Sequence, residues 1–350
     1  MIAIYWIRLI IACLGVVFTV TSMAAPPLPS FNIDENSISV SGVSSGGYLA
    51  QQFHVAYSAS VMGAAIIAAG PYRCAGTGYP WNLWRVFNRC MNAQDMTPFL
   101  GPPNVQDSIQ VTRDEADLGH IDDPGNLQND KVYLFSGTRD ETVPSAVMGT
   151  LNRYYGEFVD DVNMAYVNDI AAGHGMITDD GGNARCDVTE TPFINDCDYD
   201  TAGALLTHIY GNELVPPGDW DNNALLAFDQ GEFSDDIRTA SLNDTGYVYV
   251  PESCRNGQQC RLHVAFHGCR QHVAAIGNIF YTQAGYNEWA ATNNIIVLYP
   301  QAAARGSVFF PWPNPRGCWD WWGYTGPDFY HKSGAQLAAV KAMIDRLIGR

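Results

Sequence analysis

The stretch SGVSSGGY, residues 41–48, decides how the rest of this 350-residue sequence is interpreted. It contains the pattern G-x-S-x-G, in which small flanking residues let a serine sit on a strained strand-to-helix turn with its hydroxyl exposed. The pentapeptide alone is a weak signal, because turns rich in Gly and Ser are common. Here residues 38–41 predict a strand before it, and residues 47–58 predict a helix with one apolar face after it. This context predicts that Ser44 is a nucleophile.

Outward from this turn, strand-like and helix-like runs alternate, which favours an α/β fold with a mostly parallel sheet and helices on both faces. Residues 64–69 form an apolar run between glycines, as is typical of a buried parallel strand. We expect one domain over residues 26–350, with long loops at 75–130 and 175–200. The further strands expected are 132–135, 164–167, 247–250, 262–266 and 295–299, and the further helices are 282–293 and 333–348.

A serine hydroxyl needs a base to take its proton, and the base needs an anion to hold its tautomer. Asp140 follows the strand 132–135, at the sheet edge where ligands bind in such folds. The adjacent Glu141 is the competing carboxylate. His174 follows the strand 164–167 and lies between two glycines, which leaves its ring exposed. We therefore predict a Ser44, Asp140, His174 triad.

Three other histidines have structural interpretations, because His54 falls in the helix after Ser44 while His263 and His272 flank a strand. An oxyanion hole requires two backbone N–H groups, and the residue after the nucleophile, Ser45, is expected to supply one. The second usually comes from an HGG-type loop after an early strand. No such loop precedes Ser44, but His-Gly-Cys occurs late, at 267–269.

The N-terminus predicts export. Arg8 precedes the apolar run 9–20, and small residues follow, so we expect a signal peptide over residues 1–25. A membrane anchor and a lipidated Cys13 are the alternatives. The apolar run is shorter than the roughly 20 residues that span a bilayer, and it continues well past Cys13. We expect a secreted protein, outside the cell or in a periplasm.

Eight cysteines remain after this signal, and an even number in an exported chain indicates disulfides. Zinc is the competing explanation, but no CxxC pair, HExxH motif or His/Cys cluster at ligand spacing occurs, so we expect no metal and no cofactor. Eight cysteines allow about 105 pairings. Pairing neighbours in the sequence is the most economical choice, and it predicts Cys74–Cys90, Cys186–Cys197, Cys254–Cys260 and Cys269–Cys318.

The formal net charge of −17 argues against nucleic acid or an anionic membrane as a partner, since both reward basic patches. We expect a monomer that acts on an uncharged substrate.

From residue 31 to the end, the chain resembles the extracellular polyhydroxybutyrate (PHB) depolymerases of the single-domain type, in which the α/β-hydrolase fold is circularly permuted. The stretches that carry this resemblance are 41–48, SGTRD at 136–140, GHG at 173–175, FHGC at 266–269 and GCWDWW at 317–322. The order of the chain agrees with a permutation, because the HGC strand and a strand ending in Tyr299-Pro300 come after His174. The helix 333–348 is then expected beside the strand 38–41, with both ends of the mature chain close together.

The resemblance implies that Cys269 donates the second oxyanion N–H and that the substrate is poly(3-hydroxybutyrate) or its oligomers. No separate polymer-binding domain is expected, so adsorption would use the catalytic domain itself. Flat rings cover apolar ester chains well, which predicts substrate contacts for Trp312, Trp319 and Trp322. Trp321, Tyr324, Trp81 and Trp84 are further candidates, and burial in the core is the alternative for each. Rival functions are a feruloyl or acetylxylan esterase and a non-catalytic polymer-binding protein.

Overall fold

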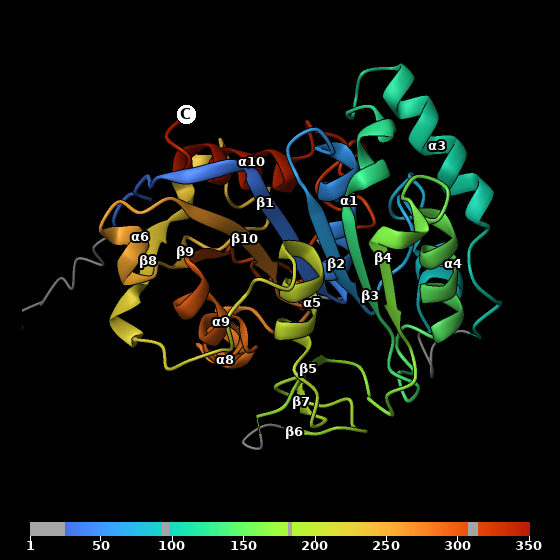
Figure 1. Cartoon of the computed structure of the whole chain (residues 1–350). Helices are drawn as coiled ribbons and strands as arrows, with labels where there is room; N and C mark the ends of the chain where they lie inside the picture. Colours follow the sequence, from blue (N-terminus) through green and yellow to red (C-terminus); the bar gives the residue numbers. More distant parts are fainter. Residues whose placement is uncertain (1–24, 93–97, 181–183, 307–313) are drawn as a thin grey trace, which may run out of the picture.

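The computed structural model describes residues 25–92, 98–180, 184–306 and 314–350. Its main sheet has eight strands in the order β4-β3-β2-β1-β10-β11-β9-β8 (Figure 1). All pairings from β4 across to β11 are parallel, and β9 and β8 are added to this edge by antiparallel pairings. The strands of this sheet are β1 (Ile33–Val43), β2 (Gly63–Ile67), β3 (Lys131–Phe135), β4 (Met164–Val167), β8 (Leu225–Asp229), β9 (Thr245–Tyr249), β10 (Cys260–Phe266) and β11 (Ile295–Tyr299).

The central strands are apolar on both sides because helices cover both faces of the sheet. Every residue of β2 and of β11 is buried, as expected for parallel strands. Alternate residues of one strand point into two separate cores: Ala64 and Ile66 into the first, Ala65 and Ile67 into the second. This arrangement confirms the predicted fold class.

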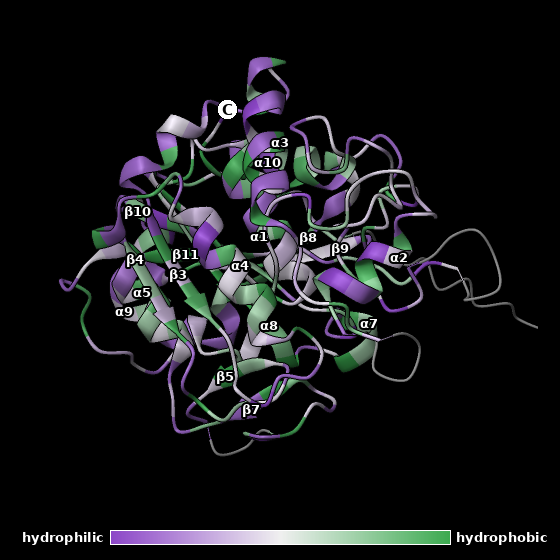
Figure 2. Ribbon diagram, turned by 90° about the vertical axis from the view of Figure 1, so that its right-hand side faces the viewer, coloured by the Kyte–Doolittle hydropathy of each residue, from purple (hydrophilic) through white to green (hydrophobic). Residues whose placement is uncertain are grey.

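The first core packs against α1, α4 and α10, and the second against α5, α8 and α9. In Figure 2 the strand β3 is largely in the hydrophobic colour, whereas the peripheral helix α3 is largely hydrophilic. The longer helices are α1 (Ser45–Ala56), α3 (Val105–Asp117), α4 (Ser145–Tyr155), α5 (Thr201–Tyr210), α9 (Tyr286–Asn293) and α10 (Ala335–Leu347). The short ones are α2 (Leu83–Arg85), α6 (Glu252–Arg255), α7 (Val273–Ile276) and α8 (Ile279–Gln283), with one π-helical turn (Val86–Cys90) and 3-10 turns at Pro124–Asn129, Asp161–Asn163, Asn222–Ala224 and Gln230–Phe233.

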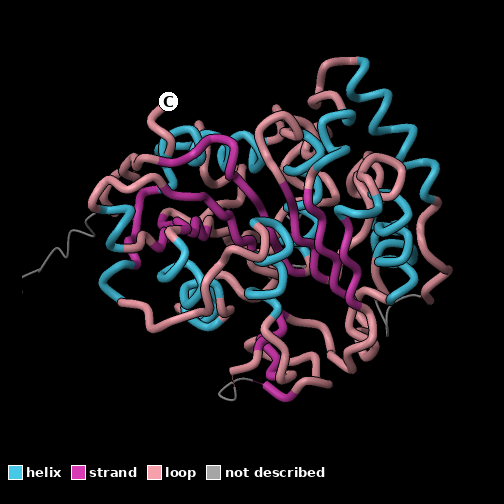
Figure 3. The backbone as a smooth tube through the Cα atoms, viewed as in Figure 1, coloured by secondary structure: helices cyan, strands magenta, loops and turns pink. Residues whose placement is uncertain are grey.

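A second, three-stranded sheet lies beyond the end of the main sheet (Figure 3). Its order is β5-β7-β6, formed by Met176–Thr178, Ile194–Asp196 and Ala184–Arg185. It falls in the stretch 175–200 that composition predicts as loop, and it directly follows His174. The histidine loop is therefore backed by hydrogen-bonded structure.

The two ends of the described chain meet beside β1. The Phe31 N–H donates to the Leu347 carbonyl at 2.8 Å, and Arg350 pairs with Glu35. Helix α10 lies alongside β1, the strand that leads into Ser44 (Figure 1). The predicted closeness of the two ends is thus confirmed, in the arrangement that a circular permutation of the sheet requires.

Two further predictions about local structure are wrong, and some elements were not predicted. The stretch 75–130 contains α3, which buries only a narrow stripe that includes Ile109 and Thr112, so its polar composition hides its helical period. The helix expected at 282–293 begins at Tyr286, because Gly285 adopts φ 84° and separates it from α8. Helices α4 and α5 and the edge strand β8 were not predicted.

The four disulfides join Cys74–Cys90, Cys186–Cys197, Cys254–Cys260 and Cys269–Cys318, which are the pairs expected from the sequence. Among the described residues, no helix combines the length and the apolar character that crossing a bilayer requires. The predicted signal peptide falls on residues 1–25, of which 1–24 lie outside the described residues. The extent of the single domain over residues 26–350 stays a prediction.

Candidate active site

Ser44 occupies the sharp turn between β1 and α1, with φ 58° and ψ −123°. A non-glycine residue with positive φ is strained, and such strain is held only where the surrounding structure over-determines it. A Cβ on Gly42 would lie 2.2 Å from the Gly46 carbonyl oxygen, and one on Gly46 would lie 2.3 Å from the Phe266 carbonyl oxygen. The backbone is packed too closely on both sides for any side chain, which explains the glycines of the motif. Ser44 is partly exposed between buried neighbours.

Asp140 and His174 come from the loops after β3 and β4. The Nδ1 atom of His174 lies 2.8 Å from Oδ2 of Asp140, and the other carboxylate oxygen accepts the N–H groups of Thr142 and Val143, both at 2.8 Å. Both side chains are nearly buried. The backbone bonds hold the carboxylate in place, so that it can fix the tautomer and orientation of the imidazole.

The acid loop and the histidine loop are joined through their backbones. The Thr138 N–H donates to the Ile170 carbonyl at 2.8 Å, and the Arg139 N–H donates to the Ala172 carbonyl at 3.0 Å. The His174 N–H donates to Thr189 Oγ1 at 2.9 Å. These bonds set the spacing of Asp140 and His174 independently of their side-chain contact.

The His-Gly-Cys loop lies directly against the nucleophile turn. A Cβ placed on Gly268 would be 3.4 Å from the Ser44 Cβ. The Cys269 N–H follows on this loop, and the Ser45 N–H is at the start of α1, where backbone N–H groups have no partner inside the helix. Both residues predicted to donate to the oxyanion hole therefore lie next to residues of the Ser44 turn.

Gln271 links the His-Gly-Cys loop to the segment that follows His174. Its Oε1 accepts the Gly268 N–H at 2.7 Å, while its Nε2 donates to the Phe193 carbonyl at 2.9 Å. The same carbonyl accepts the Met176 N–H at 2.8 Å, two residues after His174. Sequence reasoning missed Gln271 and Thr189. In the sequence, only its position three residues after Gly268 could have pointed to Gln271, and no pattern in the sequence points to Thr189.

The negative charge of Asp140 affects the pKa of Tyr48, in the first turn of α1. Burial raises the pKa of the Tyr48 hydroxyl well above its usual value, and the negative charge of Asp140 adds to this effect. Tyr48 donates to the Cys90 carbonyl at 2.5 Å. The loop that carries Asp140 therefore lies close to α1, although β2 and β3 lie between the two in the sequence.

A second serine–histidine arrangement lies inside the sheet. His263 contacts Ser39 through Nδ1 and Ser41 through Nε2, each at 2.7 Å. Both serines and the histidine have no exposed surface, and burial lowers the pKa of His263 to about 3. No carboxylate of the described chain hydrogen-bonds to this ring. The arrangement satisfies buried polar groups and is inaccessible to a substrate, as the structural interpretation of His263 expected.

The tryptophan predictions need correction. Trp319 has no exposed surface and Trp322 is 8% exposed, so neither offers a flat face to a polymer. Trp319 packs against Phe266 and His267, below the oxyanion loop. The spacing of the tryptophans in 319–322 does not reveal which of their side chains point inward. In the structure these tryptophans pack into the first core. Trp312 lies outside the described residues.

Trp81 and Trp84 lie on the surface instead, with 86% and 59% of their area exposed. Their segment is anchored to the buried tryptophan block, because Asn82 Nδ2 donates to the Trp322 carbonyl at 2.7 Å. The neighbouring Trp321 ring stacks on Tyr48 with centroids 4.0 Å apart. The segment that carries the exposed pair is therefore linked, through residues 321–322, to the first turn of α1.

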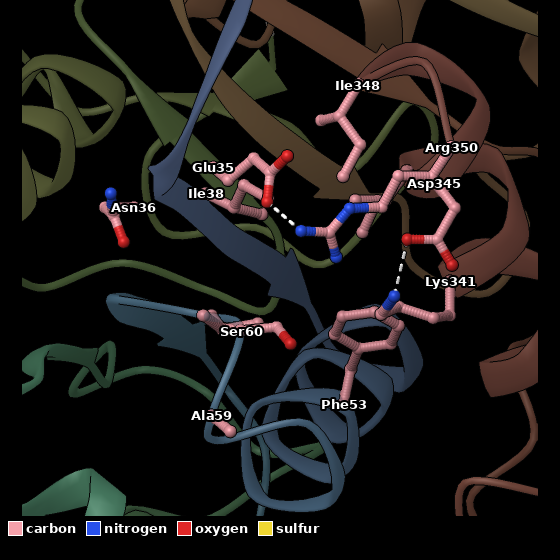
Figure 4. Close-up of a pocket in the computed structure, with 12 residues that line it drawn as sticks. Glu35, Asn36, Ile38, Phe53, Ala59, Ser60, Lys341, Asp345, Ile348 and Arg350 are labelled. Carbon is pink, nitrogen blue, oxygen red and sulfur yellow. Dashed lines mark hydrogen bonds and ion pairs between the residues drawn. The ribbon is translucent and has the colours of Figure 1, made fainter.

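A cavity of about 140 Å³ lies at the opposite end of β1, between the C-terminal ends of α1 and α10 (Figure 4). Its charged side chains are engaged in the pairs Arg350–Glu35 and Lys341–Asp345. Six residues separate its wall at Ile38 from Ser44, about 20 Å along a strand. This cavity is separate from the triad loops.

No family model matches the chain. A poly(3-hydroxybutyrate) depolymerase of Delftia acidovorans is 42% identical over 335 residues, which cover 93% of this chain and 62% of the relative. A polyhydroxybutyrate depolymerase of Talaromyces funiculosus is 37% identical, covering 93% of this chain and 94% of the relative. The chain thus spans less than two thirds of the length of the Delftia protein and nearly all of the Talaromyces one.

Two solved structures are similar over 92% of this chain and 98% of their own, each with a TM-score of 0.81 and 36% identity. One is a PHB depolymerase from Penicillium funiculosum. The other is a serine-to-alanine variant of a PHB depolymerase in complex with an R3HB trimer.

Proposed function

This chain belongs to the polyhydroxybutyrate depolymerases, a family of carboxylic ester hydrolases, and from that premise we propose that it hydrolyses poly(3-hydroxybutyrate) or its oligomers with Ser44 as nucleophile. The observation that carries the assignment of residues is the Asp140–His174 hydrogen bond of 2.8 Å, formed by two loops at the sheet edge where the strained Ser44 turn also lies. The four disulfides support secretion, since such bonds persist in oxidising compartments.

In the proposed reaction His174 takes the Ser44 proton through Nε2 as the hydroxyl oxygen attacks the ester carbonyl. Asp140 stabilises the imidazolium that forms, and the N–H groups of Ser45 and Cys269 bind the negative oxygen of the tetrahedral intermediate. The tetrahedral intermediate then collapses, and His174 protonates the departing alkoxide. The acyl group remains bound to Ser44. Water, activated by the same histidine, releases the 3-hydroxy acid and restores the enzyme.

Adsorption to a solid polyester requires an exposed apolar surface near the site. Trp81 and Trp84 provide two exposed rings, and their segment is anchored beside the first turn of α1. Aromatic rings bury a large apolar area on contact. We assign to this pair the role that the sequence had suggested for Trp319 and Trp322.

The test compares a suspension of poly(3-hydroxybutyrate) with a soluble hydroxybutyrate trimer and with ethyl ferulate. We expect falling turbidity with release of 3-hydroxybutyrate units, hydrolysis of the trimer, and little turnover of the ferulate. Preferred turnover of the ferulate would assign the protein to the carbohydrate-directed esterases instead. Absence of turnover on all three, together with no labelling of Ser44 by a fluorophosphonate, would support the non-catalytic alternative.

The double variant Trp81→Ala/Trp84→Ala separates adsorption from chemistry. It should bind polymer film more weakly and clear the suspension more slowly, while its kcat on the trimer stays at the wild-type value. Tyr247→Ala, which removes a ring from the other end of the sheet, is the matched control and should leave film binding unchanged. Equal film binding by all three proteins would contradict the role of the tryptophan pair.

A further inference from the structure

Three side chains of metal-ligating type meet near the C-terminal end of α1, away from Ser44. Glu115 lies in the last turn of α3, His120 follows that helix, and His331 lies in the loop before α10. Their ligand atoms all lie within 4.8 Å of one another. The segment after α3 is held at the end of α1, where the Asp122 N–H donates to the Ala56 carbonyl at 3.0 Å. Ala56 is about 16 Å along α1 from its start at Ser45.

One carboxylate oxygen is shared by both rings. Oε2 of Glu115 lies 2.7 Å from Nδ1 of His120 and 3.0 Å from Nε2 of His331. The two imidazoles stack, with centroids 4.4 Å apart and planes 29° from parallel. The second oxygen, Oε1, accepts the Tyr330 hydroxyl at 2.9 Å. Because Tyr330 fixes the carboxylate from behind, Oε2 is presented to both rings at once.

His331 is the member of this group that the side chains alone leave unsatisfied. Its Nε2 atom is buried and lies 3.0 Å from Oε2 of Glu115 as an ion pair rather than a well-formed hydrogen bond, and no other described group bonds to that nitrogen. With a proton, Nε2 would be a misdirected donor. Without one, its lone pair would face the lone pairs of a carboxylate. The neutral ring therefore carries the cost of an unsatisfied buried polar group, whereas the charged ring is compensated by the Glu115 carboxylate alone.

We propose that Glu115, His120 and His331 bind a divalent transition-metal ion, with Zn²⁺ as the best match. A cation between the three atoms would satisfy the His331 nitrogen and the carboxylate oxygen together. Two imidazoles with one carboxylate are a common zinc ligand set, and nitrogen ligands favour Zn²⁺ over Mg²⁺ or Ca²⁺. Bonds of about 2.0–2.1 Å at tetrahedral angles place ligand atoms about 3.3 Å apart. To hold the ion, the N···O distances of 2.7 and 3.0 Å would lengthen and the widest separation, within 4.8 Å, would shorten.

The role of this site is structural. It would connect α3 to the loop before α10, two segments that lie more than 200 residues apart in the sequence. At this point the two segments contact each other through side-chain bonds and through one backbone bond, in which the Lys332 N–H donates to the His120 carbonyl at 3.1 Å. The Tyr330–Glu115 bond serves as the outer partner that orients a ligand. Ester hydrolysis at the other end of α1 needs no metal in this arrangement.

The experiment uses the untagged, chelator-treated chain, since a polyhistidine tag would itself bind zinc. Isothermal titration with ZnCl₂ should give one site per chain with a dissociation constant in the micromolar range or tighter, and MgCl₂ should give no such site. Thermal melts should shift upward with Zn²⁺ as ligand binding to the folded state requires. His120→Gln and His331→Gln should each weaken binding at least tenfold and abolish the shift.

His208→Gln is the matched control, because His208 is half-buried like His331 but bonds to the Asn163 carbonyl away from the cluster. It should bind Zn²⁺ like the wild type. Hydrolysis of a soluble ester by all variants reports that they are folded. Absence of stoichiometric Zn²⁺ binding by the wild type would overturn the proposal, as would equal binding by His331→Gln. A loss of stability in that variant with no zinc dependence in the wild type would assign the cluster to ion pairing alone.

Discussion

The Nε2 atom of His267 accepts a hydrogen bond from the Ala302 N–H at 3.1 Å. The ring proton therefore lies on Nδ1, which donates to the Gly268 carbonyl at 2.8 Å. Burial lowers the pKa of His267 to about 3, which keeps the ring neutral. Because the Gly268 carbonyl and the Cys269 N–H belong to one planar peptide unit, fixing the first also fixes the second.

We predict that His267→Phe lowers kcat by up to about 10²-fold with a smaller change in KM, because a misdirected oxyanion donor weakens binding of the transition state more than binding of the substrate. His267→Asn should recover part of kcat, since its amide nitrogen can replace Nδ1 as the donor. Steady-state kinetics on a soluble trimer measure both. Equal loss in the two variants would show that His267 acts by packing alone.

We predict that Ser44→Ala abolishes ester hydrolysis, with a loss on the order of 10⁶ in kcat, the magnitude known for a triad nucleophile in a serine protease. Ser39→Ala is the control that separates the two serine–histidine arrangements. It removes the hydroxyl bonded to His263 at 2.7 Å and should cost about 1–3 kcal/mol of stability while retaining activity. Retained activity in Ser44→Ala, or its loss in Ser39→Ala with an unchanged melting temperature, would contradict the assignment.

We predict that removing the Cys269–Cys318 disulfide, as Cys269→Ala/Cys318→Ala, lowers both stability and kcat. The bond closes a sequence separation of 49 residues, and the chain-entropy model gives about 4 kcal/mol for such a loop. The pair Cys254–Cys260, with a separation of 6, should cost only about 2 kcal/mol by the same model and leave kcat unchanged. Urea denaturation and trimer kinetics on both double variants test this, and an equal effect on kcat would remove the oxyanion loop from the explanation.

We predict a loss of stability in mild acid from the buried histidines His263 and His267, whose pKa values are both lowered to about 3 by burial. An unfolded histidine has a pKa of about 6.5, so between that pH and about 3 the unfolded chain binds protons that the folded chain does not. Their contribution to stability is complete above pH 6.5. Below it, the free energy of unfolding falls by about 1.4 kcal/mol per pH unit for each histidine.

Urea denaturation at pH 7, 6 and 5 measures this slope. His263→Gln should reduce it by about one proton, because the glutamine does not titrate. The same slope in the variant, or stability that stays constant from pH 7 to 5, would contradict the account.

Much of the candidate site was predictable because its chemistry is local. Gly42 is required by backbone packing within the turn itself, because a Cβ there would meet the Gly46 carbonyl, and Gly46 is required where the turn packs against Phe266. Asp140 and His174 follow strands, and the carboxyl ends of parallel strands meet at one edge of a sheet. The parallel strands themselves were visible as apolar runs, and the disulfides join cysteines that are neighbours along the mature chain.

The amino-acid sequence by itself thus determined the fold class, the family and the residues proposed for the triad, since each depends on short motifs and their order. Only the tertiary structure decided which side of each loop faces inward. It buries Trp319 and exposes Trp81, it places Gln271 between two loops, and it brings His331 to Glu115 across 216 positions of the chain. The physical reason is that these contacts arise when distant segments pack against each other, and no local spacing records that packing.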